Sequence, residues 1–113
     1  MHRLIAIVLG AAVISSPVLA GDDEPPEPCF ASVGCLYDRT LSAGELNGLS
    51  CDELWTIRNG LFASRGYCFR SERGQRVFGN GTCSVSDQDQ VPLSDYDRAN
   101  IRLVSEAEKR RGC

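Results

Sequence analysis

The sequence predicts a mainly α-helical fold: a small disulfide-stapled domain with two long antiparallel helices, short helical turns and irregular loops. Three observations lead to this fold class. Two serines are good helix caps, and each precedes a stretch with apolar residues at helical spacing. The six cysteines form an even set, which is typical of small exported domains with a disulfide framework. Turns rich in glycine and asparagine separate the helical stretches.

Residues 1–20 have the pattern of a signal peptide. His2 and Arg3 form a basic head, and an apolar run follows from Leu4 to Ile14. This run is too short to span a bilayer, which needs about 20 apolar residues. We therefore expect cleavage after Ala20, export to the periplasm or the medium, and no stable membrane anchor in the mature protein.

Cleavage changes the charge and removes the only histidine. The leader holds one of the 12 basic residues and none of the 15 acidic ones, so the net charge falls from −3 to −4. An acidic chain argues against a nucleic-acid partner. Losing His2 excludes Ser–His and Cys–His catalytic pairs and histidine metal ligands. The sequence also lacks a C-x-x-C pair, so we expect neither a metal nor a cofactor.

The mature chain divides into a short tether and one domain. Residues 21–28, "GDDEPPEP", are acidic and proline-rich, as in a solvated tether. Residues 29–113 form the domain. The domain begins with a small loop between Cys29 and Cys35, in which we expect no strand pairing. One helical turn is expected near residues 42–46.

The first long helix begins at Ser50, where Ser50 and Glu53 match a capping box, and Gly66 provides a left-handed stop. A short helix is expected over residues 71–78, followed by a glycine-rich turn. The second long helix begins at Ser94 or Asp95 and runs toward Arg111. Acidic residues in its first turn and basic residues in its last turn suit the helix dipole.

Two arginines interrupt the apolar face of the first helix. On a wheel of about 100° per residue, Arg58 and Arg65 lie within the stripe of Leu54, Ile57 and Leu61. A buried guanidinium needs a carboxylate partner or must reach solvent along the apolar surface. The arginines are therefore predicted to be structural rather than ligand-binding.

The second helix supplies the matching carboxylates, because Asp97 and Glu108 lie beside its apolar residues Ile101 and Val104. If the two helices pack antiparallel, a single register, within about half a turn, brings three pairs together. These are Arg58–Glu108, Arg65–Asp97 and Cys51–Cys113.

The remaining cysteines are predicted to pair locally. Cys29 and Cys35 are neighbours in one loop, and Cys68 and Cys83 flank the segment that leaves and returns to the first helix. The spacing alone leaves other connectivities open.

Three residues are weaker candidates for ligand contact: Arg58, Asn59 and Tyr67. Asn59 lies beside Trp55 on the wheel, and we expect its amide to bond loop backbone packed against the helix. Tyr67 follows the helix stop and can face solvent. Trp55 and Phe62 are expected in the core.

The stretches "LWTIRNGLFASRGYCF", "VFGNGTC" and "PLSDYDRANIRLVSEAEKRRGC" together resemble the YARHG domain, a small extracytoplasmic bacterial domain named for its central motif. The motif positions here read Phe62-Ala63-Ser64-Arg65-Gly66, and the resemblance covers about residues 41–113. Ser64 and Arg65 stand where the motif has arginine and histidine, so no role of that histidine carries over. The resemblance implies a compartment but no particular activity.

These observations favour an exported binding or interaction module of the cell envelope, with an envelope protein or a cell-wall glycan as its partner. The alternative is a secreted inhibitor or toxin-like protein whose reactive loop lies within residues 84–92. A carboxylate-based hydrolase is less favoured, because Asp87 and Asp89 lie in a loop of solvated character and no G-x-S-x-G motif is present. We therefore expect no enzyme activity and no catalytic residues.

Overall fold

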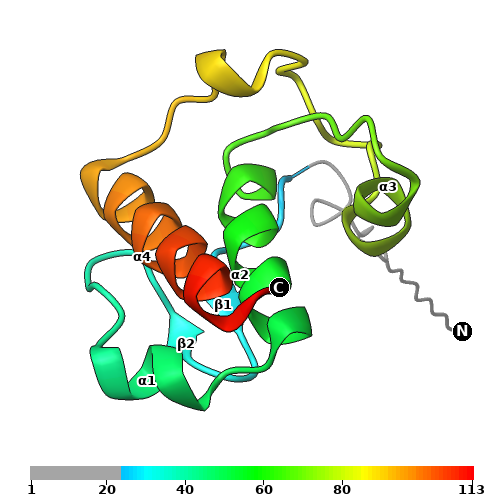
Figure 1. Ribbon diagram of the computed structural model, residues 1–113. Helices are drawn as coiled ribbons and strands as arrows, with labels where there is room; N and C mark the ends of the chain where they lie inside the picture. The colour runs from blue at the N-terminus through cyan, green and yellow to red at the C-terminus, as the bar shows by residue number, and fades with distance from the viewer. Residues whose placement is uncertain (1–23) are drawn as a thin grey trace, which may run out of the picture.

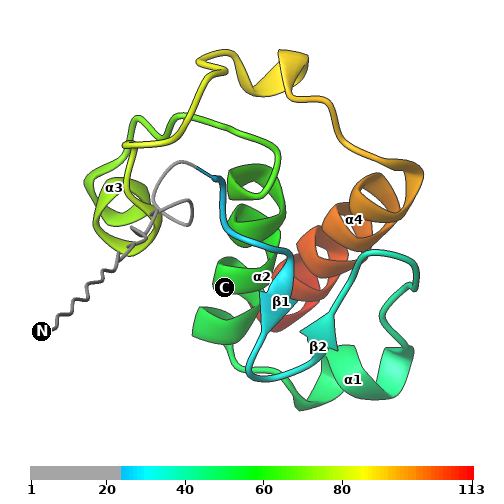
Figure 2. The ribbon, with the colours of Figure 1, turned by 180° about the vertical axis from the view of Figure 1, so that it is seen from behind.

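The computed structural model describes residues 24–113, so the predicted signal peptide and residues 21–23 of the tether lie outside it. In chain order the elements are β1 (Cys29–Phe30), β2 (Gly34–Cys35), α1 (Ala43–Gly48), α2 (Cys51–Ala63), α3 (Glu72–Phe78), the 3-10 turn η2 (Gln88–Gln90) and α4 (Asp95–Arg111). Helix α2 lies between α3 and α4 (Figure 1), and the view from behind shows the same order (Figure 2). The prediction of a mainly helical domain with three disulfides is confirmed.

A serine caps the start of each α-helix in the described part of the chain. The cap serines Ser42, Ser50 and Ser94 each accept a bond from the third helical amide, and the acidic residue at that position bonds back to the cap amide. This reciprocal arrangement satisfies two amides that would otherwise lack a partner. Helix α2 ends at Ala63, three residues before the expected stop, and Gly66 then turns the chain with a φ of 91°.

The cysteine loop near the start of the domain is a β-hairpin, so the expectation of no strand pairing was wrong. Cys29 pairs with Cys35 and Phe30 with Gly34 in an antiparallel ladder. Each strand has two residues, too few for an alternating pattern to be recognised in the sequence. The Cys29–Cys35 disulfide joins the directly paired residues and closes the hairpin.

The three contacts predicted between α2 and α4 and their ends are present. Two long antiparallel helices are not confirmed. The start of α2 is joined to the residue after α4 by Cys51–Cys113, and Arg65, just past α2, reaches the start of α4. However, α2 has only 13 residues, and α4 crosses it obliquely (Figure 1). Oblique crossing is the ordinary result when side-chain ridges of one helix pack into grooves of another.

The main core lies between α1, α2, α4 and the segment after the hairpin. Its buried members are all aliphatic: Leu36, Leu41, Leu46, Leu49, Leu54, Ile57, Leu61, Val104 and Ala107. Asn100 is fully buried among them. Its side-chain amide donates to the Arg39 carbonyl at 2.9 Å, and its oxygen accepts from the Leu41 amide at 2.8 Å. A buried amide with both ends bonded ties α4 to the segment before α1.

A second cluster packs under α3 and consists of aromatic rings. We call it the aromatic cluster, and its contacts run in sequence through Trp55, Phe78, Phe69, Tyr67 and Phe62, with ring centroids 4.8–5.9 Å apart. The segment that carries α3 is closed at its base by the Cys68–Cys83 disulfide. The side-chain amide of Asn80 also bonds both backbone groups of Phe69, at 3.0 and 2.9 Å.

Gly74 lets α3 lie close to the aromatic cluster, and this contact gives a first prediction. A Cβ at position 74 would lie 2.5–2.7 Å from three side-chain atoms of Phe69, closer than carbon atoms can pack. Gly74→Ala should therefore destabilise the protein by about 1–3 kcal/mol through overpacking, even though alanine favours helix by about 1 kcal/mol. Urea unfolding followed by the fluorescence of Trp55 measures this.

The matched control is Gly48→Ala, because Gly48 is also helical and a Cβ there would meet nothing within 4 Å. It should be neutral or mildly stabilising. Equal effects of the two substitutions would show that Phe69 does not press against α3.

Candidate binding site

Gly60 in the middle of α2 allows the hairpin to lie against the helix. A Cβ at this position would lie 2.4 Å from Cε1 of Phe30. Glycine is unfavourable inside a helix by about 1 kcal/mol relative to alanine, and close approach of another segment is a common reason for its presence. The ring of Phe30 is thus seated on the backbone of α2.

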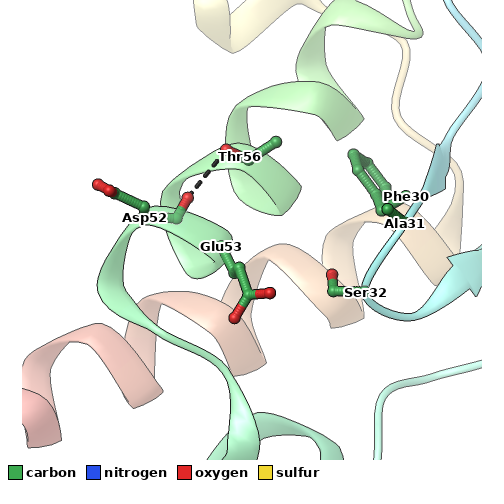
Figure 3. A pocket seen from close by; sticks show the side chains of 6 residues that line it. All are labelled: Phe30, Ala31, Ser32, Asp52, Glu53 and Thr56. Carbon is green, nitrogen blue, oxygen red and sulfur yellow. Dashed lines mark hydrogen bonds between the residues drawn. The ribbon is translucent and has the colours of Figure 1, made fainter.

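A hollow of about 190 Å³ opens beside this contact. Phe30, Ala31 and Ser32 of the hairpin form one side, and Asp52, Glu53 and Thr56 of α2 form the other. The two sets of side chains lie across the hollow from each other (Figure 3). Pockets for whole drug-sized ligands measure roughly 300–1,000 Å³. The hollow is therefore the right size for one side chain or one sugar ring of a larger partner.

Bonds within the domain orient the polar groups of the hollow. The hydroxyl of Thr56 donates to the Asp52 carbonyl at 2.8 Å, which leaves its oxygen able to accept. Glu53 accepts from the Ser50 amide through Oε1 at 2.9 Å, and Asp52 accepts from Arg73 through Oδ1 at 3.0 Å. Within residues 24–113, the second oxygen of each carboxylate accepts no hydrogen bond. Glu53 and Thr56 on the α2 side of the hollow therefore offer acceptors to a ligand that carries hydroxyl or N–H groups, while the Asp52 carboxylate points away from the hollow (Figure 3).

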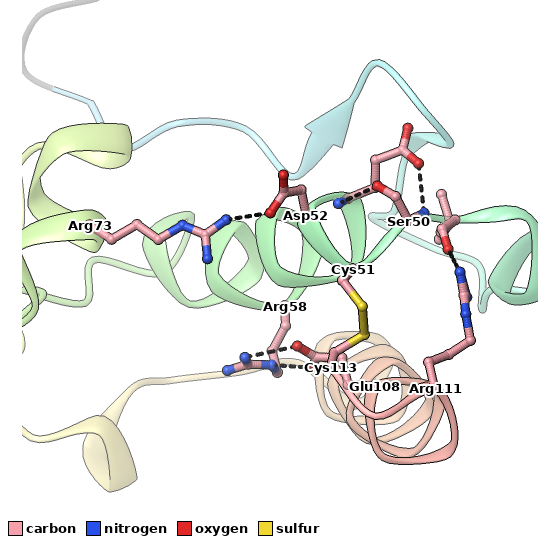
Figure 4. The surroundings of a disulfide bond; sticks show 10 residues. Ser50, Cys51, Asp52, Arg58, Arg73, Glu108, Arg111 and Cys113 are labelled. Carbon is pink, nitrogen blue, oxygen red and sulfur yellow. Dashed lines mark hydrogen bonds and ion pairs between the residues drawn. A yellow bond between two sulfur atoms is a disulfide. The ribbon is translucent and has the colours of Figure 1, made fainter.

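The three ligand candidates predicted from the sequence do not line this hollow. Arg58 donates from Nε and Nη2 to the two carboxylate oxygens of Glu108, at 2.6 and 3.1 Å (Figure 4). The half-buried Tyr67 packs between Phe62 and Phe69. A ligand-binding role for Arg58, Asn59 or Tyr67 stays a prediction.

The expected partner of Asn59 was wrong. Its side-chain amide donates to the carbonyl of Trp55, one turn earlier in the same helix, at 3.0 Å. A short amide side chain inside a helix reaches the carbonyl four residues back more readily than a separate loop.

The second arginine holds a fully buried carboxylate. Oδ2 of Asp97 accepts from Nε of Arg65 at 2.6 Å and from the Ser94 amide at 2.9 Å. Its other oxygen, Oδ1, is buried and has no partner within residues 24–113. Together with Arg58–Glu108, this is the arrangement of ion pairs predicted from the two helical wheels.

The three disulfides are also those proposed from the sequence: Cys29–Cys35, Cys51–Cys113 and Cys68–Cys83. Cys51–Cys113 lies between the start of α2 and the end of α4 (Figure 4). Beside it, Arg111 donates to the carbonyl of Leu49. The end of α2 that carries Asp52 and Glu53 is therefore fastened to α4 by both a covalent bond and a hydrogen bond.

A further ion pair fixes the start of α1. Arg39 donates two bonds to the carboxylate of Glu45, at 3.0 and 2.8 Å, and these bonds lower the pKa of Glu45 to about 2. A lowered pKa means that the pair stabilises the fold above the unfolded pKa of glutamate and loses this effect as the pH falls toward 2. The contribution is therefore complete at neutral pH.

The sequence missed the residues that line the hollow, although two signals pointed to it. Gly60 indicated that some segment approaches α2, and the Cys29–Cys35 spacing indicated a tight loop. Neither signal shows that the two meet. That contact joins residues 30 positions apart, and only the folded chain reveals it.

Comparison with known proteins identifies the domain. The profile of the YARHG domain family matches residues 32–109. No curated protein and no solved structure gives a significant match. Within residues 24–113, every helix is too short or too polar to cross a membrane. The profile spans most of the chain, including α1, α2 and α3 and nearly all of α4, and the chain therefore belongs to the YARHG domain family.

Proposed function

We propose that the protein is an exported binding module of the bacterial cell envelope, and that the hollow beside Phe30 holds a protruding group of an envelope protein or cell-wall glycan. The family is a small extracytoplasmic one whose molecular function is unknown. Three disulfides fit an exported protein. These observations support the location, and the hollow supports the binding role.

The observation that carries the proposal is the rigid frame around the hollow. The hairpin on one side is closed by Cys29–Cys35, and the α2 turn on the other is fastened by Cys51–Cys113. A site held in its bound shape loses little conformational entropy when it binds. The ring of Phe30 offers an apolar face, and Glu53 and Thr56 place oxygens that can accept hydrogen bonds beside it. A sugar ring or a side chain with donor groups matches this combination.

The test fills the hollow. Ser32→Arg places a large side chain at its exposed rim, and Ser86→Arg makes the same change at an exposed position outside it. We expect wild-type protein and Ser86→Arg to be retained by purified cell-wall sacculi or by immobilised envelope proteins. Ser32→Arg should lose at least about tenfold in affinity. Equal retention of all three proteins would exclude the hollow as the binding site.

The inhibitor alternative has one observation in its favour. Within the predicted loop of residues 84–92, residues 86–90 arch away from the helices (Figure 1) and are all exposed. The arch is anchored by Cys83 at one end and by buried Val91 at the other. Within it, the amide of Asp89 donates to Oδ1 of Asp87 at 3.0 Å, so Asp87 acts as a turn residue. Inhibition of a secreted hydrolase that disappears on replacing residues 86–90 would favour this alternative over the binding module.

A further inference from the structure

We infer that the outer face of α3 is a docking surface for an acidic protein segment, next to the hollow and beyond the function proposed above. This face, called the α3 arginine face, consists of Arg70, Arg73, Arg76, Val77 and the half-buried Trp55. The three arginines recur at three-residue spacing along the α3 segment. All of them are exposed. The spacing places Arg73 and Arg76 on one side of α3, and Arg70 lies just before the Ser71 cap.

Arg73 is held in position before any partner arrives. Its guanidinium lies 3.8 Å from the centre of the Trp55 ring and donates to Oδ1 of Asp52 at 3.0 Å. The ring of Trp55 is itself stacked on Phe78 within the aromatic cluster. An arginine ordered by an aromatic ring loses less freedom when it binds a carboxylate, because part of its entropy is already lost.

The other two arginines have spare hydrogen-bonding capacity. Arg76 has only a weak contact with Glu72, at 3.8 Å, and both side chains are largely exposed. Arg70 forms no ion pair within the described part of the chain. Weak, solvent-exposed pairs contribute little, so carboxylates of a partner can replace them at small cost.

Composition and charge together indicate the kind of partner. Tryptophan and arginine dominate the energetics of protein interfaces, and Val77 adds an apolar contact that is 52% exposed. The three arginines outnumber the two carboxylates paired with them, Asp52 and Glu72, so the face stays basic, while the mature chain has a net charge of −4 by the count above. The positive field of this face attracts an acidic partner, and the negative charge on the rest of the surface repels it. A sugar ring fits less well, because Arg73 already covers one side of Trp55.

Trp55 provides the measurement, because it is the only tryptophan and contacts Arg73 directly. The probe is a synthetic ten-residue peptide rich in glutamate with two leucines. We expect it to change the Trp55 emission saturably, with affinity that falls as salt is added. The same peptide with glutamine in place of glutamate should give no saturable change.

Variants decide whether this face is the site. Arg70→Glu with Arg76→Glu should weaken binding by about tenfold or more. Arg102→Glu with Arg110→Glu makes the same charge change at exposed positions of α4, on the opposite side of α2, and should change affinity by less than about threefold because only long-range fields are altered. Urea unfolding checks that both variants remain folded.

The inference is overturned by three results. One is the absence of any peptide binding by the wild-type protein. Another is an equal loss in the two double variants, which would indicate a general charge effect. The last is binding of the acidic polysaccharide polygalacturonate, but not the peptide, through Arg70 and Arg76. Retention by sacculi in the hollow experiment does not affect any of these outcomes.

Discussion

Replacing Cys51 and Cys113 together by serine is expected to remove about 4 kcal/mol of stability, the largest loss from any one of the three disulfides. The two cysteines are 62 residues apart in sequence, and opening a loop of this length returns the most entropy to the unfolded chain. Typical domains are stable by only about 5–15 kcal/mol. The variant should therefore unfold at much lower urea concentration or fail to accumulate.

The comparison is with the other two pairs, each replaced in the same way. Cys29–Cys35 and Cys68–Cys83 close much shorter loops, of sequence separation 6 and 15, and should contribute about 2 and 3 kcal/mol. Urea unfolding of the three double variants gives the order directly. A greater loss from the Cys29–Cys35 pair would mean that native contacts at the hairpin, rather than chain entropy, dominate.

Arg65→Met is expected to cost about 3 kcal/mol or more, because it leaves a buried carboxylate without its counter-charge. Asp97 is fully buried, and Arg65 is its only charged partner within residues 24–113. Methionine fills much of the space of the arginine stem, so the loss reports on charge more than on packing. Thermal or urea unfolding at pH 7 measures it.

A double-mutant cycle isolates the pair. Asp97→Asn keeps an oxygen for the Ser94 amide but removes the charge, so Arg65→Met should be much less damaging in that background. Coupling of about 1 kcal/mol or more is expected. Additive effects would indicate that the two side chains act independently. Arg58→Met is the milder comparison, because Glu108 is 15% exposed and water can partly solvate it.

The helices and their ion pairs could be predicted from the sequence because their signals are local. A capping box spans four residues, and an arginine on an apolar helical face needs either a carboxylate or a path to solvent. A single antiparallel register brought Arg58, Arg65 and Cys51 next to their predicted partners. This left few ways to pair the two helices. The crossing angle was not predictable, since it depends on how the side-chain ridges of α2 and α4 interlock.

The candidate site was not predictable for the opposite reason. Its two sides come from the hairpin and from α2, and nothing in either segment alone indicates the other. Phe30 is an ordinary apolar residue until its ring is placed on Gly60. Arg73 and Trp55 were likewise assigned no joint role, because their contact depends on α3 folding back over α2.

The placement of the disulfides determines what happens to the protein when a protease cuts it. Residues 86–90 are all exposed and lie between Cys51 and Cys113 in sequence. A single backbone cut there leaves the two pieces covalently joined, with α4 still fastened to α2. Helix α3 precedes the cut and stays on the larger piece through its own backbone. The protein would persist as a two-chain form with its hollow intact, recognisable only after reduction.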